Sequence, residues 1–231
     1  MNKIIILIIF MAFTPCAHAK GTNITIQIIM DDSGVLINPS EADQYKMQFL
    51  LHIKRLVRKR KFSTAHIDVI SSSIGRTVWS GTPSDLKRKA ARALALVNAV
   101  KSIPQNCNNL SGAFNELASN LRALKRQGYR AAHVIVFSSL IHTPRPCTKT
   151  TKITLPQLPP VKGNINKALT SFKGIRSIDF YWVSPHQMLG WEEFLSPTLL
   201  WADQHDTRFN LRDIERSKFS LQRALKLEAP K

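Results

Sequence analysis

The residues best suited to chemistry form one short run, Asp31-Asp32-Ser33, which is followed by Gly34. Two carboxylates and a hydroxyl come directly after an apolar stretch, residues 24–30, that is typical of a strand buried on both faces. Open α/β sheets form their ligand sites at the carboxyl ends of strands. The run therefore marks the place where a hard cation, a phosphoryl group or a partner protein would bind.

The segments that must position this run alternate along the chain. Further strands are expected at residues 66–71, 76–80, 133–138 and 177–183, and helices at residues 40–61, from 82 onward, 110–126, 164–172 and 187–201. Strands that alternate with helices this regularly indicate parallel βαβ units. The predicted fold class is α/β, with an open, mostly parallel sheet flanked by helices.

Three motifs in this order resemble the von Willebrand factor type A (vWA) domain, a Rossmann-like α/β fold. Asp31-Asp32-Ser33-Gly34-Val35 is similar to the DxSxS motif of that family. Residues 108–114 resemble the loop and helix start that supply its metal-site threonine. Residues 134–139 resemble the strand that ends in its Thr/Ser-Asp pair. In order of elements the resemblance covers residues 23–202.

The resemblance implies a metal-ion-dependent adhesion site, in which serine, threonine and aspartate oxygens hold a divalent cation, usually Mg²⁺. Carried over residue by residue, Asp31 and Ser33 match this site. Val35 replaces the second serine and offers no oxygen, Asn108 takes the threonine position, and Ser139 takes the later aspartate position. The site is therefore expected to be degenerate. Either Asp31 and Ser33 bind Mg²⁺, or they cap the next helix and hold the turn.

Asp32 occupies an intervening position of the motif, so its side chain is expected to point away from that of Asp31. Together with Ser33, Asn108 and Ser139, the two aspartates would mark a face at the strand ends where a partner protein binds. Families with this fold and such an eroded site are often interaction modules in bacterial envelope machines, including conjugation and secretion apparatus. This step is an analogy between folds. The expected function is protein interaction without catalysis.

The same run also resembles the opening of haloacid-dehalogenase-type phosphatases. In that family one aspartate attacks phosphorus, and a second aspartate two residues later is the general acid and base. Asp31 would be the nucleophile and Ser138 the family's Ser/Thr, but Ser33 stands at the acid/base position. The acidic pair that would hold Mg²⁺ after residues 177–183 is missing. A periplasmic phosphatase that uses Asp31 is the alternative function.

The first 19 residues are typical of a secretory signal peptide, with cleavage after Ala19. Lys3 precedes an apolar run, residues 4–13, that is too short to span a bilayer as a helix. Cys16 raises the alternative of a lipoprotein. No later stretch approaches about 18 consecutive apolar residues, so no integral membrane segment is expected after cleavage. The expected location is periplasmic or secreted.

Cys107 and Cys147 are the two cysteines left after this cleavage. An oxidising compartment favours their pairing. Under the vWA order of elements both lie on loops at the same edge of the sheet as Asp31, so the resemblance implies a disulfide between them. Two separated thiols are the alternative.

The chain is strongly basic, with 33 Lys and Arg against 15 Asp and Glu and a formal net charge of +18. This charge favours anionic membranes, nucleic acid or acidic proteins as partners, or it only keeps the protein soluble. A basic amphipathic helical tail is expected from residue 206 to 227, which would bind an anionic membrane, nucleic acid or its own domain. The predicted organisation is a signal peptide (1–19), a vWA-like domain (20–203) and this tail (204–231).

Overall fold

The computed structural model describes residues 23–32, 62–88, 108–143, 155, 159 and 164–220. The predicted signal peptide, the helix expected at residues 40–61, and the end of the expected tail at residues 221–231 lie outside these ranges. Ser33, Val35 and the two cysteines also lie outside them.

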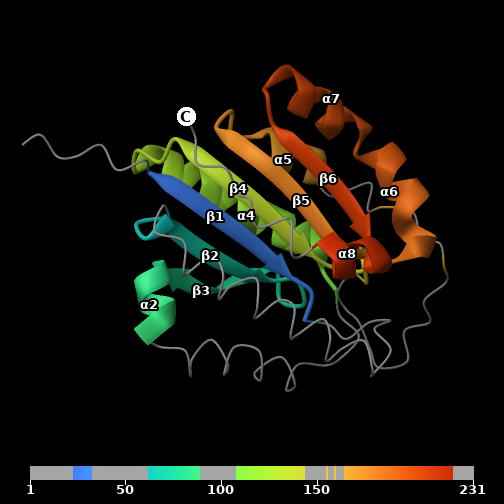
Figure 1. Ribbon diagram of the computed structural model, residues 1–231, viewed down its shortest axis with the longest axis horizontal. Coiled ribbons are helices and arrows are strands. Elements are labelled where there is room, and N and C mark those ends of the chain that lie inside the picture. The colour runs from blue at the N-terminus through green and yellow to red at the C-terminus, as the bar shows by residue number, and fades with distance from the viewer. Residues whose placement is uncertain are drawn as a thin grey trace, which may run out of the picture.

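One six-stranded sheet organises the described residues (Figure 1), with the strand order β3-β2-β1-β4-β5-β6. The strands are β1 (Ile24–Met30), β2 (His66–Ser71), β3 (Arg76–Gly81), β4 (Ala131–Phe137), β5 (Ile175–Val183) and β6 (Arg208–Asp213). Neighbouring strands are parallel except for the antiparallel pair of β2 and β3. This order brings the carboxyl ends of β2, β1 and β4 to one edge of the sheet. The predicted α/β class with an open, mostly parallel sheet is confirmed.

Helices pack on both faces of this sheet. They are α2 (Pro83–Arg88), α4 (Leu110–Arg126), α5 (Ile165–Thr170), α6 (Met188–Phe194), α7 (Ser196–Gln204) and α8 (Ile214–Ser220), with the 3₁₀ turn η3 (Pro185–Gln187) before α6. In Figure 1, α4 and α5 lie behind the sheet and α8 lies in front of it. Helices α6 and α7 follow one another beyond the edge strand β6. Within the described ranges, no helix has the length and apolar character needed to cross a membrane.

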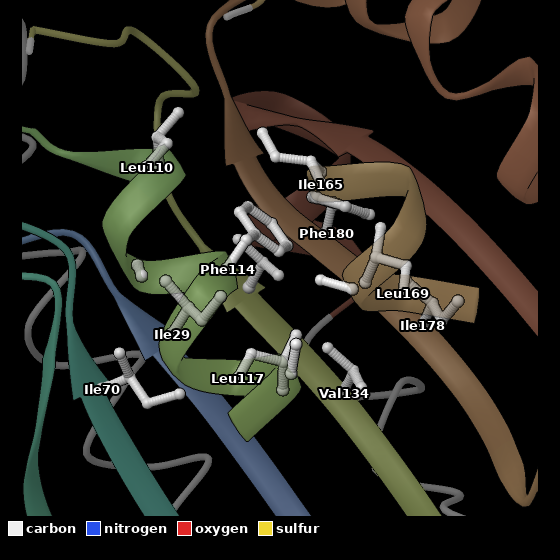
Figure 2. Packing of buried hydrophobic residues seen from close by; sticks show 14 of the residues in the cluster. Ile29, Ile70, Leu110, Phe114, Leu117, Val134, Ile165, Leu169, Ile178 and Phe180 are labelled. Carbon is white, nitrogen blue, oxygen red and sulfur yellow. The ribbon is translucent and has the colours of Figure 1, made fainter. Parts of the chain in front are cut away.

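Helix α4 is the main cover of one face of the sheet. Its buried apolar residues recur every three or four positions, at Leu110, Phe114, Leu117 and Leu121, which is the spacing of a single helical stripe. Figure 2 shows part of this stripe packed against apolar side chains of β1, β2, β4, β5 and α5. The predicted helix at residues 110–126 is confirmed with the same bounds.

The expectation of a helix from residue 206 is wrong for Arg208–Asp213, which form strand β6. β6 pairs in parallel with β5. The physical reason is that apolar and polar side chains alternate along this segment with a period of two residues. Phe209 and Leu211 pack into the core on the α4 side, whereas polar side chains of the strand face the other way and donate hydrogen bonds to Asp179. Residues two apart point to the same face of a strand, whereas on a helix they point to nearly opposite sides and could not be buried together on one face.

Two further boundaries differ from the prediction. The sheet continues past residue 203, where the domain was expected to end. The single helix expected at residues 187–201 is divided into α6 and α7. Pro197 lies in the first turn of α7, where its missing N–H costs nothing because that group has no partner within the helix. A new helix therefore starts there more easily than the old one continues.

Candidate functional site

Asp31 and Asp32 follow directly on β1, and both are buried, with exposures of 3% and 6%. The backbone N–H of Asp31 donates to the carbonyl of Phe137, 2.8 Å away, so the strand pairing with β4 extends to this residue. On the other side, the N–H of Ser72 donates to the carbonyl of Met30 at 3.0 Å. The aspartates are thus held between the ends of β4 and β2.

The Asp31 carboxylate collects donors from two other segments of the chain. Its Oδ2 atom accepts hydrogen bonds from Nδ2 of Asn108 at 2.9 Å, from Oγ of Ser138 at 2.9 Å and from Oγ of Ser139 at 3.3 Å. All four residues are buried. The structure therefore brings together three of the residues predicted for the partner face and adds Ser138, which the sequence suggested only for the phosphatase alternative.

Asp32 points away from this group, as expected for the intervening residue of the motif. Its Oδ2 atom accepts a hydrogen bond from Oγ of Ser71 at 2.5 Å, and its Oδ1 atom accepts one from the backbone N–H of Ser73 at 2.9 Å. Both donors belong to the end of β2 and the turn after it. Asp32 therefore fixes that turn and takes no part in the cluster around Asp31.

Asn108, which precedes α4, connects β1 to the loop after β4. Besides Asp31, its Nδ2 atom donates to the carbonyl of Ile141 at 2.6 Å. Its backbone N–H donates to Oγ1 of Thr143 at 2.5 Å, and its carbonyl accepts from the backbone N–H of Thr143 at 2.9 Å. Nδ1 of His142 lies 3.1 Å from the same carbonyl. Burial lowers the pKa of His142, although this hydrogen bond acts in the opposite direction.

The loop after β4 contains a strained residue, Leu140, whose φ of 60° lies in the left-handed region. This conformation costs a non-glycine residue about 1–2 kcal/mol. Its backbone N–H donates to Oγ of Ser138 at 3.0 Å. Its carbonyl accepts from Nε1 of Trp191 at 3.0 Å and from Nε2 of Gln187 at 3.2 Å. These contacts hold the strained turn in place and attach it to η3 and α6.

We name Asp31, Asn108, Ser138, Ser139 and Thr143 the strand-end cluster. The sequence alone does not point to Thr143, Gln187 or Trp191 as site residues, because their side chains bind backbone groups of distant residues. An indole N–H at a fully buried position needs a partner, but the sequence does not say which.

The vWA resemblance implies Mg²⁺ at this place, and the described residues do not fit it. The carboxylate oxygen Oδ2 of Asp31 faces three hydrogen-bond donors, one of them the amide nitrogen of Asn108. Oδ1 of Asn108 has no hydrogen-bond partner among the described residues. If the Asn108 amide were flipped, its Oδ1 atom would face the carbonyl oxygen of Ile141 and the Asp31 carboxylate. Oxygen acceptors repel one another, so the amide nitrogen belongs on this side.

Mg²⁺ requires several oxygen ligands, and the described cluster supplies one carboxylate, whose Oδ2 atom already accepts three hydrogen bonds. No group of three or more His, Cys, Asp or Glu side chains that could hold a metal occurs in the described part of the chain. The role of Ser33 as a ligand stays a prediction, since Ser33 lies outside the described ranges.

No protein-family model matches the sequence, and no curated protein matches it. Solved structures with a similar fold include a point mutant of the PilB minor pilin from Streptococcus sanguinis, with a TM-score of 0.53 and 12% identity over 88% of this chain. The pilus adhesin SpaC from Lactobacillus rhamnosus GG matches with a TM-score of 0.55 and 11% identity over 88% of this chain.

A manganese-loaded TRAP protein from Plasmodium vivax matches with a TM-score of 0.51 and 12% identity over 88% of this chain and 73% of its own. The present chain spans 59% of the pilin and 29% of the adhesin. At this identity the comparisons show the fold alone. They agree with the vWA-like α/β architecture.

Proposed function

We propose that this chain is an exported protein-interaction module, a component or accessory of a bacterial envelope machine such as a conjugation or secretion apparatus, and that it is not an enzyme. The observation that carries the proposal is the strand-end cluster. Its polar groups are buried and hydrogen-bonded to one another, so in this proposal they hold loops in place beneath the surface.

The partner would meet the loops that the cluster holds. Asp31 braces the loop after β4 through Ser138 and Ser139, and Asp32 braces the turn after β2. Of the neighbouring residues, Pro185 and His186 in η3 are exposed. Rigid loops lose little conformational entropy on binding, which favours affinity. In this proposal the predicted site residues are positioning residues beneath the contact surface.

The phosphatase alternative lacks support from the geometry. A nucleophilic carboxylate needs an accessible oxygen with a free lone pair in line with phosphorus. Asp31 is only 3% exposed, and its Oδ2 atom already accepts three hydrogen bonds.

Binding of a membrane or nucleic acid through the tail is also less favoured. Arg208 is committed to an ion pair with Asp179 at 3.0 Å, and the guanidinium of Arg212 lies 5.7 Å from the centre of the Tyr181 ring. Two cations of the expected tail therefore serve the fold. The fold shared with a minor pilin and a pilus adhesin supports an exported interaction module over a lipid or DNA binder.

Site-specific photo-crosslinking in the cell envelope tests this proposal. A photoreactive residue at His186, at the strand ends, should capture a partner protein. The same residue at exposed Gln127, after α4 at the opposite edge of the sheet, is the matched control and should capture none. Equal capture at both positions would contradict a strand-end interface.

An assay of phosphate-ester hydrolysis is the second test of this proposal. We expect no turnover of a generic phosphate ester with or without Mg²⁺. Mg²⁺-dependent hydrolysis that Asp31→Asn abolishes would replace the proposal with the phosphatase.

A further inference from the structure

A second surface lies on α6 and α7, on the outer side of β5 and β6 (Figure 1). The exposed large hydrophobic residues of the described ranges are all found there: Leu189 (78% exposed), Leu200 (64%) and Leu199 (43%). Scattered single leucines on a surface need no explanation, but here all three lie between residues 189 and 200, on two consecutive helices.

The same segment has an unusual charge. Residues 177–207 contain five acidic residues and neither Lys nor Arg, in a chain with 33 Lys and Arg against 15 Asp and Glu. Of the five, Asp179 is buried and paired with Arg208. The other four are exposed: Glu192, Glu193, Asp203 and Asp206. Within the described residues none of these four has an ion-pair partner.

Helical spacing places these acids beside the leucines. Glu192 and Glu193 follow Leu189 by three and four residues, and Asp203 follows Leu200 by three, so each pair shares one side of its helix. The opposite sides are buried through Trp191 in α6 and through Thr198 and Ala202 in α7. Each helix thus presents leucine and carboxylate together to solvent. We name the three leucines and four acids the acidic-apolar surface.

The fold gains nothing from this exposure. A leucine left in water forgoes about 1.5–3 kcal/mol that burial would supply, and the acids add no ion pair to the described structure. A partner that covers the leucines would supply this burial energy, and its cations would form ion pairs with the acids.

We propose that the acidic-apolar surface docks a basic amphipathic helix of another protein. Carboxylates repel lipid phosphate and nucleic acid, which excludes both as ligands of this surface. A second copy of this chain carries the same net charge of +18, and the mutual repulsion of two such chains opposes self-association. A short helix that carries Leu on one side and Lys or Arg beside it is not repelled in this way, because its cations attract the carboxylates. This surface begins at Leu189, three residues after His186, but it is tested by its own peptides and variants, so its failure would leave the proposed strand-end interface standing.

The test uses the full chain and two synthetic helical peptides with the same leucine stripe, one flanked by Lys and one by Glu. Fluorescence anisotropy should show binding of the lysine peptide, weakened by salt, and none of the glutamate peptide. Leu189→Ser and Glu193→Gln should each weaken binding by about tenfold, which corresponds to about 1.4 kcal/mol. Glu215→Gln, which removes an exposed charge from α8, is the matched control and should leave binding unchanged.

Three results would overturn the proposal. The lysine peptide does not bind while circular dichroism shows every variant folded, or both peptides bind equally, or Glu215→Gln weakens binding as much as Glu193→Gln. Sedimentation velocity provides a fourth. A concentration-dependent dimer that Leu189→Ser dissolves would assign the surface to a second copy of this chain instead.

Discussion

The side-chain amide nitrogen of Asn108 lies 2.9 Å from Oδ2 of Asp31, 77 residues earlier in the chain. The same nitrogen donates to the carbonyl of Ile141. One amide group therefore joins the end of β1, the residue before α4 and the loop after β4. An uncharged donor here stabilises a buried carboxylate without an ion, in keeping with a brace beneath an interaction surface.

Removal of this amide should destabilise the domain strongly. Asn108→Ala leaves a buried carboxylate and a buried carbonyl each one donor short, so we expect a loss of about 3 kcal/mol in the free energy of unfolding. The measurement is urea denaturation followed by circular dichroism.

Asn109 is a matched control for this substitution, because it is the next residue and of the same type. Its side chain caps α4 by accepting from the N–H of Gly112 at 3.0 Å. Asn109→Ala should therefore cost about 1 kcal/mol. Equal losses for the two variants would show that Asn108 does no more than a helix cap.

Divalent cations should leave the stability of the protein unchanged. Oδ2 of Asp31 already accepts hydrogen bonds from three donors, so neither Mg²⁺ nor EDTA is expected to shift Tm in differential scanning calorimetry. A rise in Tm with Mg²⁺ that disappears in Asp31→Asn would show that a cation displaces Asn108.

A second buried polar group links β1 and β2 and should give the stability a pH dependence. Nε2 of His66 lies 3.0 Å from Oδ1 of Asp68, and Nε2 of Gln27 donates to Oδ2 of Asp68 at 2.7 Å. The hydrogen bond to Asp68 raises the pKa of His66 above its ordinary value of 6.5, against the effect of burial. Burial acts to raise the pKa of Asp68, but hydrogen bonds from His66, Gln27 and Ser80 outweigh it, so the pKa falls below 3.8.

The directions of these two pKa shifts define the pH range in which the pair of His66 and Asp68 stabilises the fold. A raised histidine pKa contributes stability that is complete below 6.5 and is lost as the pH rises through the folded value. A lowered aspartate pKa contributes stability that is present above 3.8 and is lost as the pH falls through its folded value. His66→Gln should therefore lower Tm most between these pH values and least in alkaline buffer. A decrease in Tm that does not vary with pH would contradict the ion pair.

Strand β6 should be protected from hydrogen exchange as part of the sheet. Asn210 donates to Oδ1 of Asp179 at 2.6 Å, and Asp179 is 1% exposed. Asn210→Ala should cost about 1–3 kcal/mol because the buried carboxylate loses a donor. Exchange in residues 208–213 as fast as in an isolated peptide would show that this segment does not belong to the sheet.

Much of the fold could be predicted because burial leaves a periodic trace. Mostly apolar runs mark β1 and β4, and the 3.6-residue stripe marks α4. The prediction failed at β6, where Phe209 and Leu211 alternate with polar residues. With many cations nearby, this short alternation resembles one face of a basic helix, and only its pairing with β5 identifies it as a strand.

The place of the site follows from the sequence, because Asp31 and Asp32 come directly after a buried strand and parallel strands share one carboxyl edge. The tertiary structure shows which groups surround it. The strand order places Ser138 and Asn108, 107 and 77 residues from Asp31, around one oxygen atom. Whether a buried carboxylate meets a cation or a set of donors depends on which distant side chains arrive there, and no local pattern encodes that contact.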